Sequence, residues 1–112
     1  MEKVTGDIRV VLISVPDIGS GVGLARALLE ERAVACVNLM QGVESLYWWE
    51  GRIEQSAEIL LVAKTVAGAL ESVERVVREN HPYECPEILA LPVAEGAGRY
   101  LSWLRESVRA RE

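Results

Sequence analysis

The chain has 112 residues, a length typical of one domain, and 50% of them are hydrophobic, which is enough for a core. Its 17 acidic and 12 basic residues give a formal net charge of −5. This balance argues against nucleic acid or an anionic membrane as a general partner, because phosphate binding needs clustered lysine and arginine. No apolar run approaches the ~20 residues of a membrane span.

The length predicts a single domain over 1–112, and the N-terminus predicts a cytoplasmic location. Residues 1–7 form a polar tail without the apolar centre of a secretory signal. Cys36 and Cys85 belong to no C-x-x-C pair and should be thiols in a reducing compartment. The simplest role of Cys36 is that of a small buried hydrophobic residue.

The first predicted strand covers 8–15, where apolar and mostly β-branched residues follow one another up to Pro16. Such a run is typical of a strand covered on both sides. Residues 17–21 have loop chemistry, with Asp17 or Ser20 as the cap of the next helix. The core face of that helix should consist of Val22, Ala25, Leu28 and Leu29.

A long hairpin follows. Residues 36–49 alternate unevenly, which suits a strand with a bulge or bend at Gly42. Glu50 and Gly51 are the predicted tight turn. The return strand starts at Arg52 and ends in the apolar run 59–63, which marks a second interior strand.

The last third of the chain predicts a helix, a strand and a helix. The first helix covers about 68–80 and ends before Pro82, since proline disfavours helix at the preceding residue. Residues 88–93 form a short strand in which Pro92 suits a sheet edge. A final helix covers about 97–109.

The resulting order, βαββαβ plus a C-terminal helix, predicts an α+β ferredoxin-like fold. The first and third strands lie in the middle of a four-stranded sheet, the other two form its edges, and both crossover helices lie on one face. The other face of the sheet therefore needs a cover.

The hairpin is too long for its own domain. From Cys36 to Trp49 a strand spans roughly 45 Å at ~3.3 Å per residue, whereas a compact chain of this length is about 35 Å across. A long aromatic edge in water is an aggregation liability, so we expect self-association. The alternative is that the aromatic side chains fold back onto their own sheet. The overhanging end carries Tyr47, Trp48, Trp49 and Ile53.

Five segments stand out between Ile8 and Val108: 35–38, 45–51, 58–65, 81–88 and 100–104. In their residues, order and spacing they resemble the CutA divalent-cation-tolerance family. The resemblance implies a homotrimer of ferredoxin-like subunits joined through the long hairpins, with an architecture related to the PII signalling proteins. It also implies a part in tolerance to divalent cations, chiefly copper. The trimer interface would then include the four side chains of the overhanging end.

His81 is the only histidine and the first candidate metal ligand. Glu84 and Cys85 follow it closely, and folding or a neighbouring subunit would have to bring Cys36 near. Imidazole and thiolate suit copper or zinc, but structural zinc usually needs four ligands. We therefore expect weak binding of Cu²⁺ or another divalent cation, not required for folding. The alternative is that His81 caps a helix end.

The chain also departs from the family pattern. Copper ligation proposed for some members uses a cysteine on the first strand, where this chain has Ile13 and Ser14, and a pair of histidines, where it has Asn80 and His81. Position 85 is Cys where Val or Thr would be expected.

Two further patterns have simple explanations. Gly19, Gly21 and Gly23 open a helix after a strand, but Leu24 breaks the dinucleotide fingerprint and the P-loop lysine is absent, so a loop or helix cap is the better interpretation. Four charged residues beside apolar strands are expected to form salt bridges between chains or to line a cleft between subunits. They are Arg52, Glu58, Lys64 and Glu84.

The predicted function is a non-catalytic, homotrimeric divalent-cation tolerance protein. The alternative is a PII-like signalling trimer that binds a small anion or nucleotide in intersubunit clefts, although the chain lacks a long basic loop. An acylphosphatase-type hydrolase is disfavoured because residues 16–23 contain no arginine. No serine or cysteine has a convincingly spaced catalytic histidine either.

Overall fold

The computed structural model describes residues 1–4 and 6–109. Its main sheet is antiparallel, in the order β3-β4-β2-β5. The strands are β2 (Ile8–Val15), β3 (Cys36–Trp49), β4 (Arg52–Val66) and β5 (Ile88–Pro92). The two apolar strands are central and the other two form the edges, as the sequence predicts.

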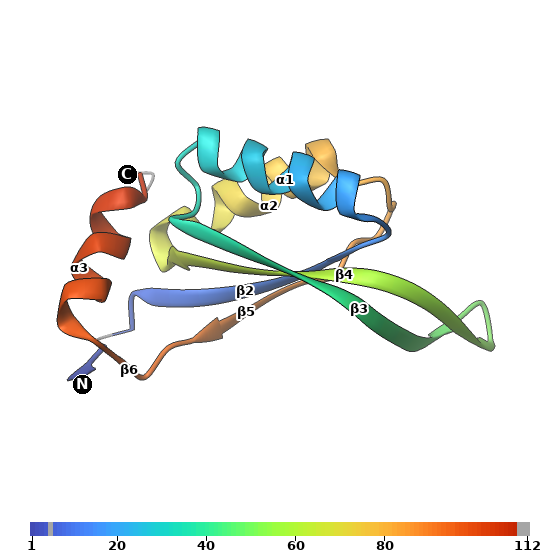
Figure 1. Ribbon diagram of the computed structural model, residues 1–112, viewed down its shortest axis with the longest axis horizontal. Coiled ribbons are helices and arrows are strands. Elements are labelled where there is room, and N and C mark those ends of the chain that lie inside the picture. The colour runs from blue at the N-terminus through green and yellow to red at the C-terminus, as the bar shows by residue number, and fades with distance from the viewer. Residues whose placement is uncertain (5, 110–112) are drawn as a thin grey trace.

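Two helices cover one face of this sheet (Figure 1). They are α1 (Ile18–Glu30) and α2 (Leu70–Asn80), the latter preceded by the 3-10 turn η1 (Ala67–Ala69). The core lies between helices and sheet, where the apolar stripes of the helices meet the inward side chains of β2 and β4. Its largest members include Ile13, Leu24, Leu28, Leu61, Val73, Val76 and Val77.

The start of α1 differs from the sequence prediction. The helix begins at Ile18, within the predicted loop, because the Asp17 carboxylate accepts the Ser20 backbone N–H at 2.8 Å. Its buried stripe is Gly21, Leu24, Ala25 and Leu28. Val22 and Leu29 flank this stripe at 42% and 40% exposure, so their predicted place on the core face is wrong.

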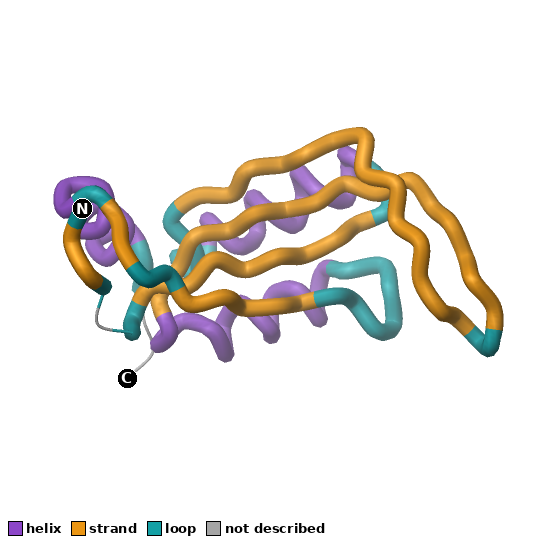
Figure 2. The backbone as a smooth tube through the Cα atoms, turned by 90° about the horizontal axis from the view of Figure 1, so that it is seen from below, coloured by secondary structure: helices purple, strands orange, loops and turns teal. Residues whose placement is uncertain are grey.

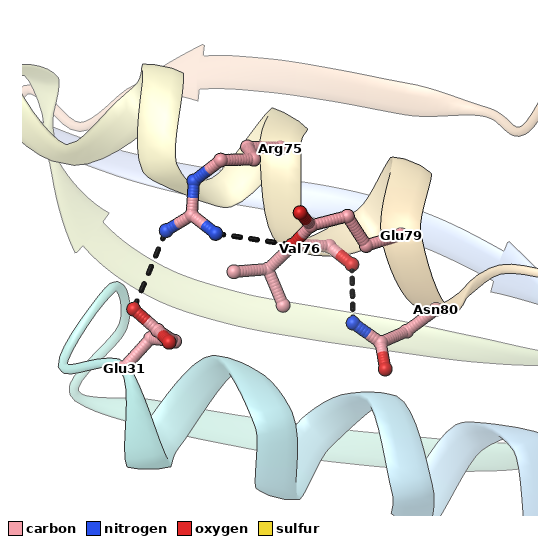
Figure 3. Close-up of polar contacts among 5 residues, drawn as sticks. All are labelled: Glu31, Arg75, Val76, Glu79 and Asn80. Atoms are coloured by element: carbon pink, nitrogen blue, oxygen red, sulfur yellow. Dashed lines mark hydrogen bonds and ion pairs between the residues drawn. The ribbon is translucent and has the colours of Figure 1, made fainter.

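Surface ion pairs join α2 to the end of α1. Arg75 on α2 contacts Glu31, just after α1, at 3.3 Å and Glu79 on its own helix at 3.0 Å (Figure 3). The Asn80 side-chain amide donates to the Val76 carbonyl at 2.8 Å (Figure 3). The exposed ion pairs contribute little to stability beside the apolar core.

The end of the sheet is closed by α3 (Gly98–Ser107), whose Leu101 and Leu104 join a second buried cluster with Ile8. A small sheet pairs β1 (Glu2–Lys3) with β6 (Glu95–Gly96), so part of the predicted polar tail is a short strand. Among the described residues, no helix combines the length and apolarity needed to cross a membrane.

The hairpin extends past the rest of the domain (Figures 1 and 2). β2 pairs with β4 only from Ile59 to Val66, and beyond that point 43–49 and 52–58 pair with each other alone. We call this two-stranded segment, residues 43–58, the arm. It gives the molecule extents of 43 × 26 × 22 Å.

Local chemistry shapes the arm at both ends. A register shift between Met40 and Val43 marks the predicted bulge, where Gly42 has φ +77°. Glu50 and Gly51 have φ of +49° and +78°, the left-handed pair that a type I′ hairpin turn requires.

The face of the sheet opposite α1 and α2 is uncovered (Figure 2). Directly paired residues point to the same side, so the register identifies this face. It is largely apolar, with Met40, Leu89 and Leu91 exposed by 52%, 56% and 45%. The other apolar members are Val10, Leu12, Leu60 and Val62.

Candidate functional site

A groove of about 770 Å³ lies between the arm and the segment that follows α2. We call it the arm-base groove. Its walls are acidic and aromatic: Glu44, Tyr47, Trp49 and Glu58 come from the arm, and Tyr83, Glu84, Cys85 and Glu87 from the opposite segment. Ser14, at the end of β2, contributes to it as well.

Glu58 is the buried acid of this groove, only 8% exposed. The Tyr83 hydroxyl donates a hydrogen bond to its Oε2 at 3.1 Å. Burial, and then the neighbouring Glu58, raise the pKa of Tyr83 to about 12. Within the described residues, no basic side chain forms an ion pair with Glu58.

His81 fixes the wall opposite the arm. Its Nδ1 accepts the Tyr83 backbone N–H at 3.0 Å, which leaves the ring proton on Nε2. Nε2 lies 2.6 Å from the Ser14 carbonyl and donates to it. His81 is also the C-terminal cap residue of α2, and its backbone N–H donates to the Val77 carbonyl. In this arrangement both ring nitrogens already have hydrogen-bond partners.

The four predicted metal ligands do not meet within one chain. Cys36 faces Lys64, with Sγ 3.9 Å from Nζ. His81 is bonded to Ser14, which pairs with Leu60. The paired positions Leu60 and Lys64 are four residues apart along β4, or about 13 Å.

Glu84 and Cys85 lie together at the mouth of the groove, and both are exposed. In the part of the chain that the structure describes, no three His, Cys, Asp or Glu side chains are arranged to hold a metal ion. A single chain therefore offers isolated candidate ligands rather than a complete coordination shell.

The four predicted interface residues all lie on the arm. Tyr47, Trp48, Trp49 and Ile53 are exposed by 42%, 73%, 53% and 64%. The alternative in which they fold back onto their own sheet is therefore wrong. Trp48 and Ile53 are paired, and alternation places them with Leu46 on the opposite side of the arm from Tyr47 and Trp49.

The family is decided by comparison with known proteins. The family model described as "CutA1 divalent ion tolerance protein" matches residues 9–107. The chain belongs to the CutA1 family. It is 47% identical over 99 residues to "Divalent-cation tolerance protein CutA" of Thermus thermophilus, covering 88% of this chain and 96% of that protein.

Plant members of the CutA1 family are similar but longer. "Protein CutA 1, chloroplastic" of Oryza sativa is 43% identical over 100 residues, which cover 89% of this chain and 56% of the rice protein. "Protein CutA, chloroplastic" of Arabidopsis thaliana is 42% identical, with 55% of its length covered. The chain thus spans little more than half the length of these relatives.

Solved CutA1 structures share the fold. The protein of Thermus thermophilus has a TM-score of 0.90 at 45% identity, with 91% of this chain and 99% of that chain covered. CutA1 of Oryza sativa has a TM-score of 0.90 at 42% identity, with 94% and 96% covered. These matches confirm the predicted α+β, ferredoxin-like fold.

Sequence reasoning did not assemble the groove. The sequence marks Glu58 and Glu84 as charges beside strands and Glu84 also as a candidate metal ligand, but it assigns no role to Tyr83 or Glu87. The available signal was the composition of residues 83–87, Tyr-Glu-Cys-Pro-Glu, just after a helix end. What this segment faces depends on the hydrogen bond between His81 and a backbone carbonyl, which no sequence pattern reports.

Proposed function

We propose that this CutA1 chain is a divalent-cation tolerance protein that works as a homotrimer, by binding rather than by catalysis. The observation that carries the proposal is a pair of apolar surfaces on one chain: the uncovered face of the sheet and the outer side of the arm. Both are exposed to an extent unusual for a monomer, and such patches mark interaction sites.

The two surfaces suit a head-to-tail contact between copies. The side of the arm that carries Leu46, Trp48 and Ile53 projects beyond its own sheet, so it is free to cover the open face of a neighbouring copy. Contacts of this kind close into a ring when the rotation allows it. The choice of three copies rests on the CutA resemblance.

Metal binding is the second part of the proposal. The names of the bacterial relatives refer to divalent-cation tolerance. Glu84 and Cys85 are the accessible ligands of this chain, whereas ligation by His81 would cost one of its two ring hydrogen bonds. A tight site for Cu²⁺ then needs ligands from more than one chain, and otherwise binding is weak.

Calorimetric titration tests this assignment. Cu²⁺, with Zn²⁺ as a redox-inert comparison, is titrated into the wild type and into Cys85→Ser, His81→Ala and Cys36→Ser. We expect Cys85→Ser to weaken binding at least about tenfold, because a thiolate is the softest ligand at the groove. Cys36→Ser shows whether a neighbouring copy supplies that thiol as a further ligand, in which case it weakens binding as well. Unchanged heats in both Cys85→Ser and His81→Ala would remove this segment as the metal site.

A PII-like signalling trimer is the alternative, and the charge of the groove disfavours it. The glutamates that line the groove favour a cation over the small anion or nucleotide that this role requires. Screening ATP, cyclic nucleotides and common anions for a shift in melting temperature separates the two roles.

A cytoplasmic location is also part of the proposal, and cell fractionation tests it.

A further inference from the structure

We propose that the arm-base groove binds an organic ammonium cation, of the aliphatic diamine class, with Glu58 as its anionic anchor. This goes beyond metal tolerance, since the ligand is a small amine and every named contact comes from one chain. The proposal rests on the burial of Glu58, its incomplete set of partners, and the aromatic and acidic walls around it.

Glu58 is the first step of the argument. The residue is only 8% exposed, yet the one hydrogen-bond partner of its carboxylate among the described residues is the neutral phenol of Tyr83, on Oε2. Oε1 accepts no hydrogen bond from that part of the chain, and Glu58 lines the groove. Oε1 is not among the fully buried atoms of the described residues, so a ligand cation in the groove can reach it and form a charge-assisted hydrogen bond.

The walls define the chemistry of that ligand. Tyr47, Trp49 and Tyr83 line the groove. The faces of aromatic rings attract ammonium groups more than neutral ones. An ammonium group also carries three donors, enough to reach Oε1 while staying solvated on its open side. Because the described residues hold no three-ligand cluster, a metal ion bound by the groove of one chain would be held weakly, and it leaves the Glu58 position open to an organic cation.

Carboxylates on a second wall of the groove favour a ligand with two ammonium groups over one with a single ammonium group. Glu84 and Glu87 lie on the wall opposite the arm, so the groove presents carboxylates on two sides. Its volume of about 770 Å³ lies within the range of small-molecule sites. Alternation along the arm places Tyr47 and Trp49 on the same side as Glu58, whose partner in the register is Val43.

The test uses the whole chain and putrescine as the probe, with binding measured by calorimetry at low ionic strength. We expect saturable binding that Glu58→Gln weakens by about tenfold or more, because a charge-assisted hydrogen bond is lost. Glu30→Gln is the matched control: it removes the same charge from an exposed residue at the C-terminal end of α1, away from the groove, and should change affinity less than about twofold.

Further variants keep the result decisive if Glu58→Gln fails to fold. Glu87 is exposed, so Glu87→Gln should fold normally and still weaken putrescine binding several-fold. The proposal would be overturned if Glu30→Gln lowered the affinity for putrescine as much as Glu58→Gln does. It would also be overturned if Mg²⁺ at matched ionic strength displaced putrescine completely, because either result means that the overall negative charge attracts the cation. Failure of the wild-type protein to bind putrescine would overturn it too, with the groove filled by a neighbouring copy as one explanation. None of these outcomes affects the Cu²⁺ titration, so the two proposals fail separately.

Discussion

Replacing Trp48 by alanine should weaken the association of the chain with its copies. Trp48 is 73% exposed on the outer side of the arm. A tryptophan presents about 200 Å², so roughly 150 Å² would leave water in a contact that covers it. At ~25 cal/mol per Å² this contributes about 3–4 kcal/mol per contact. Each contact should therefore weaken more than ~100-fold.

The assay is light scattering over a dilution series, with circular dichroism on the same samples. We expect Trp48→Ala to dissociate at concentrations at which the wild type stays assembled, while its helices and strands persist. Leu29→Ala is the control, since Leu29 is also a large exposed apolar residue (40%), but on α1, on the covered side of the sheet. Identical dilution curves for Trp48→Ala and the wild type would refute the reasoning.

Three predictions concern the stability of the chain itself. Thr65→Val should lower the free energy of unfolding by about 1–3 kcal/mol, because it removes a buried 2.6 Å hydrogen bond to a backbone carbonyl; urea denaturation measures this. Gly23→Ala should stabilise α1 by about 0.5–1 kcal/mol, because a Cβ at that position meets nothing described within 4 Å. Gly21→Ala should stabilise the helix less or destabilise it, since its Cβ would lie 3.1–3.5 Å from core side chains. The melting temperatures of the two variants test this difference. The Arg105 guanidinium lowers the pKa of Asp7 below 3.8, so this pair stabilises the fold above that pH and the contribution is lost as pH falls through the lowered pKa. Asp7→Asn should therefore flatten the acid limb of a stability–pH curve by less than about 1 kcal/mol, as expected of an exposed pair, and an unchanged limb would contradict this.

The parts of the fold that sequence predicts well are those set by neighbouring residues. The Asp17 cap, the bulge at Gly42 and the Glu50–Gly51 turn all follow from local backbone chemistry, and all are present. The two interior strands are also predicted correctly, because continuous apolar runs have few other interpretations.

The differences arise where tertiary contacts decide. Gly21 faces the core because its missing side chain lets α1 approach Leu39 and Val15, and a glycine adds nothing to a hydrophobic pattern. The pairing of Glu2–Lys3 with β6 is too short to leave a sequence signal.

The candidate site is predictable only in fragments for the same reason. Glu58 and Tyr83 lie 25 residues apart, and they meet because His81 anchors the intervening segment to the Ser14 carbonyl. Cys36 and His81 are both suitable metal ligands by their chemistry, but the registers of β2 and β3 with β4 keep them apart. Side-chain chemistry suggests partners, and the register decides which of them can meet.

In the proposed assembly, neighbouring copies cover the apolar side of the arm and the open face of the sheet. The most direct measurement is the mass of the wild-type chain in dilute neutral buffer, by light scattering coupled to gel filtration. One chain weighs 12.3 kDa, and three times that mass, about 37 kDa, is the value that the account predicts. A folded species of 12.3 kDa, with the arm in water, would contradict it.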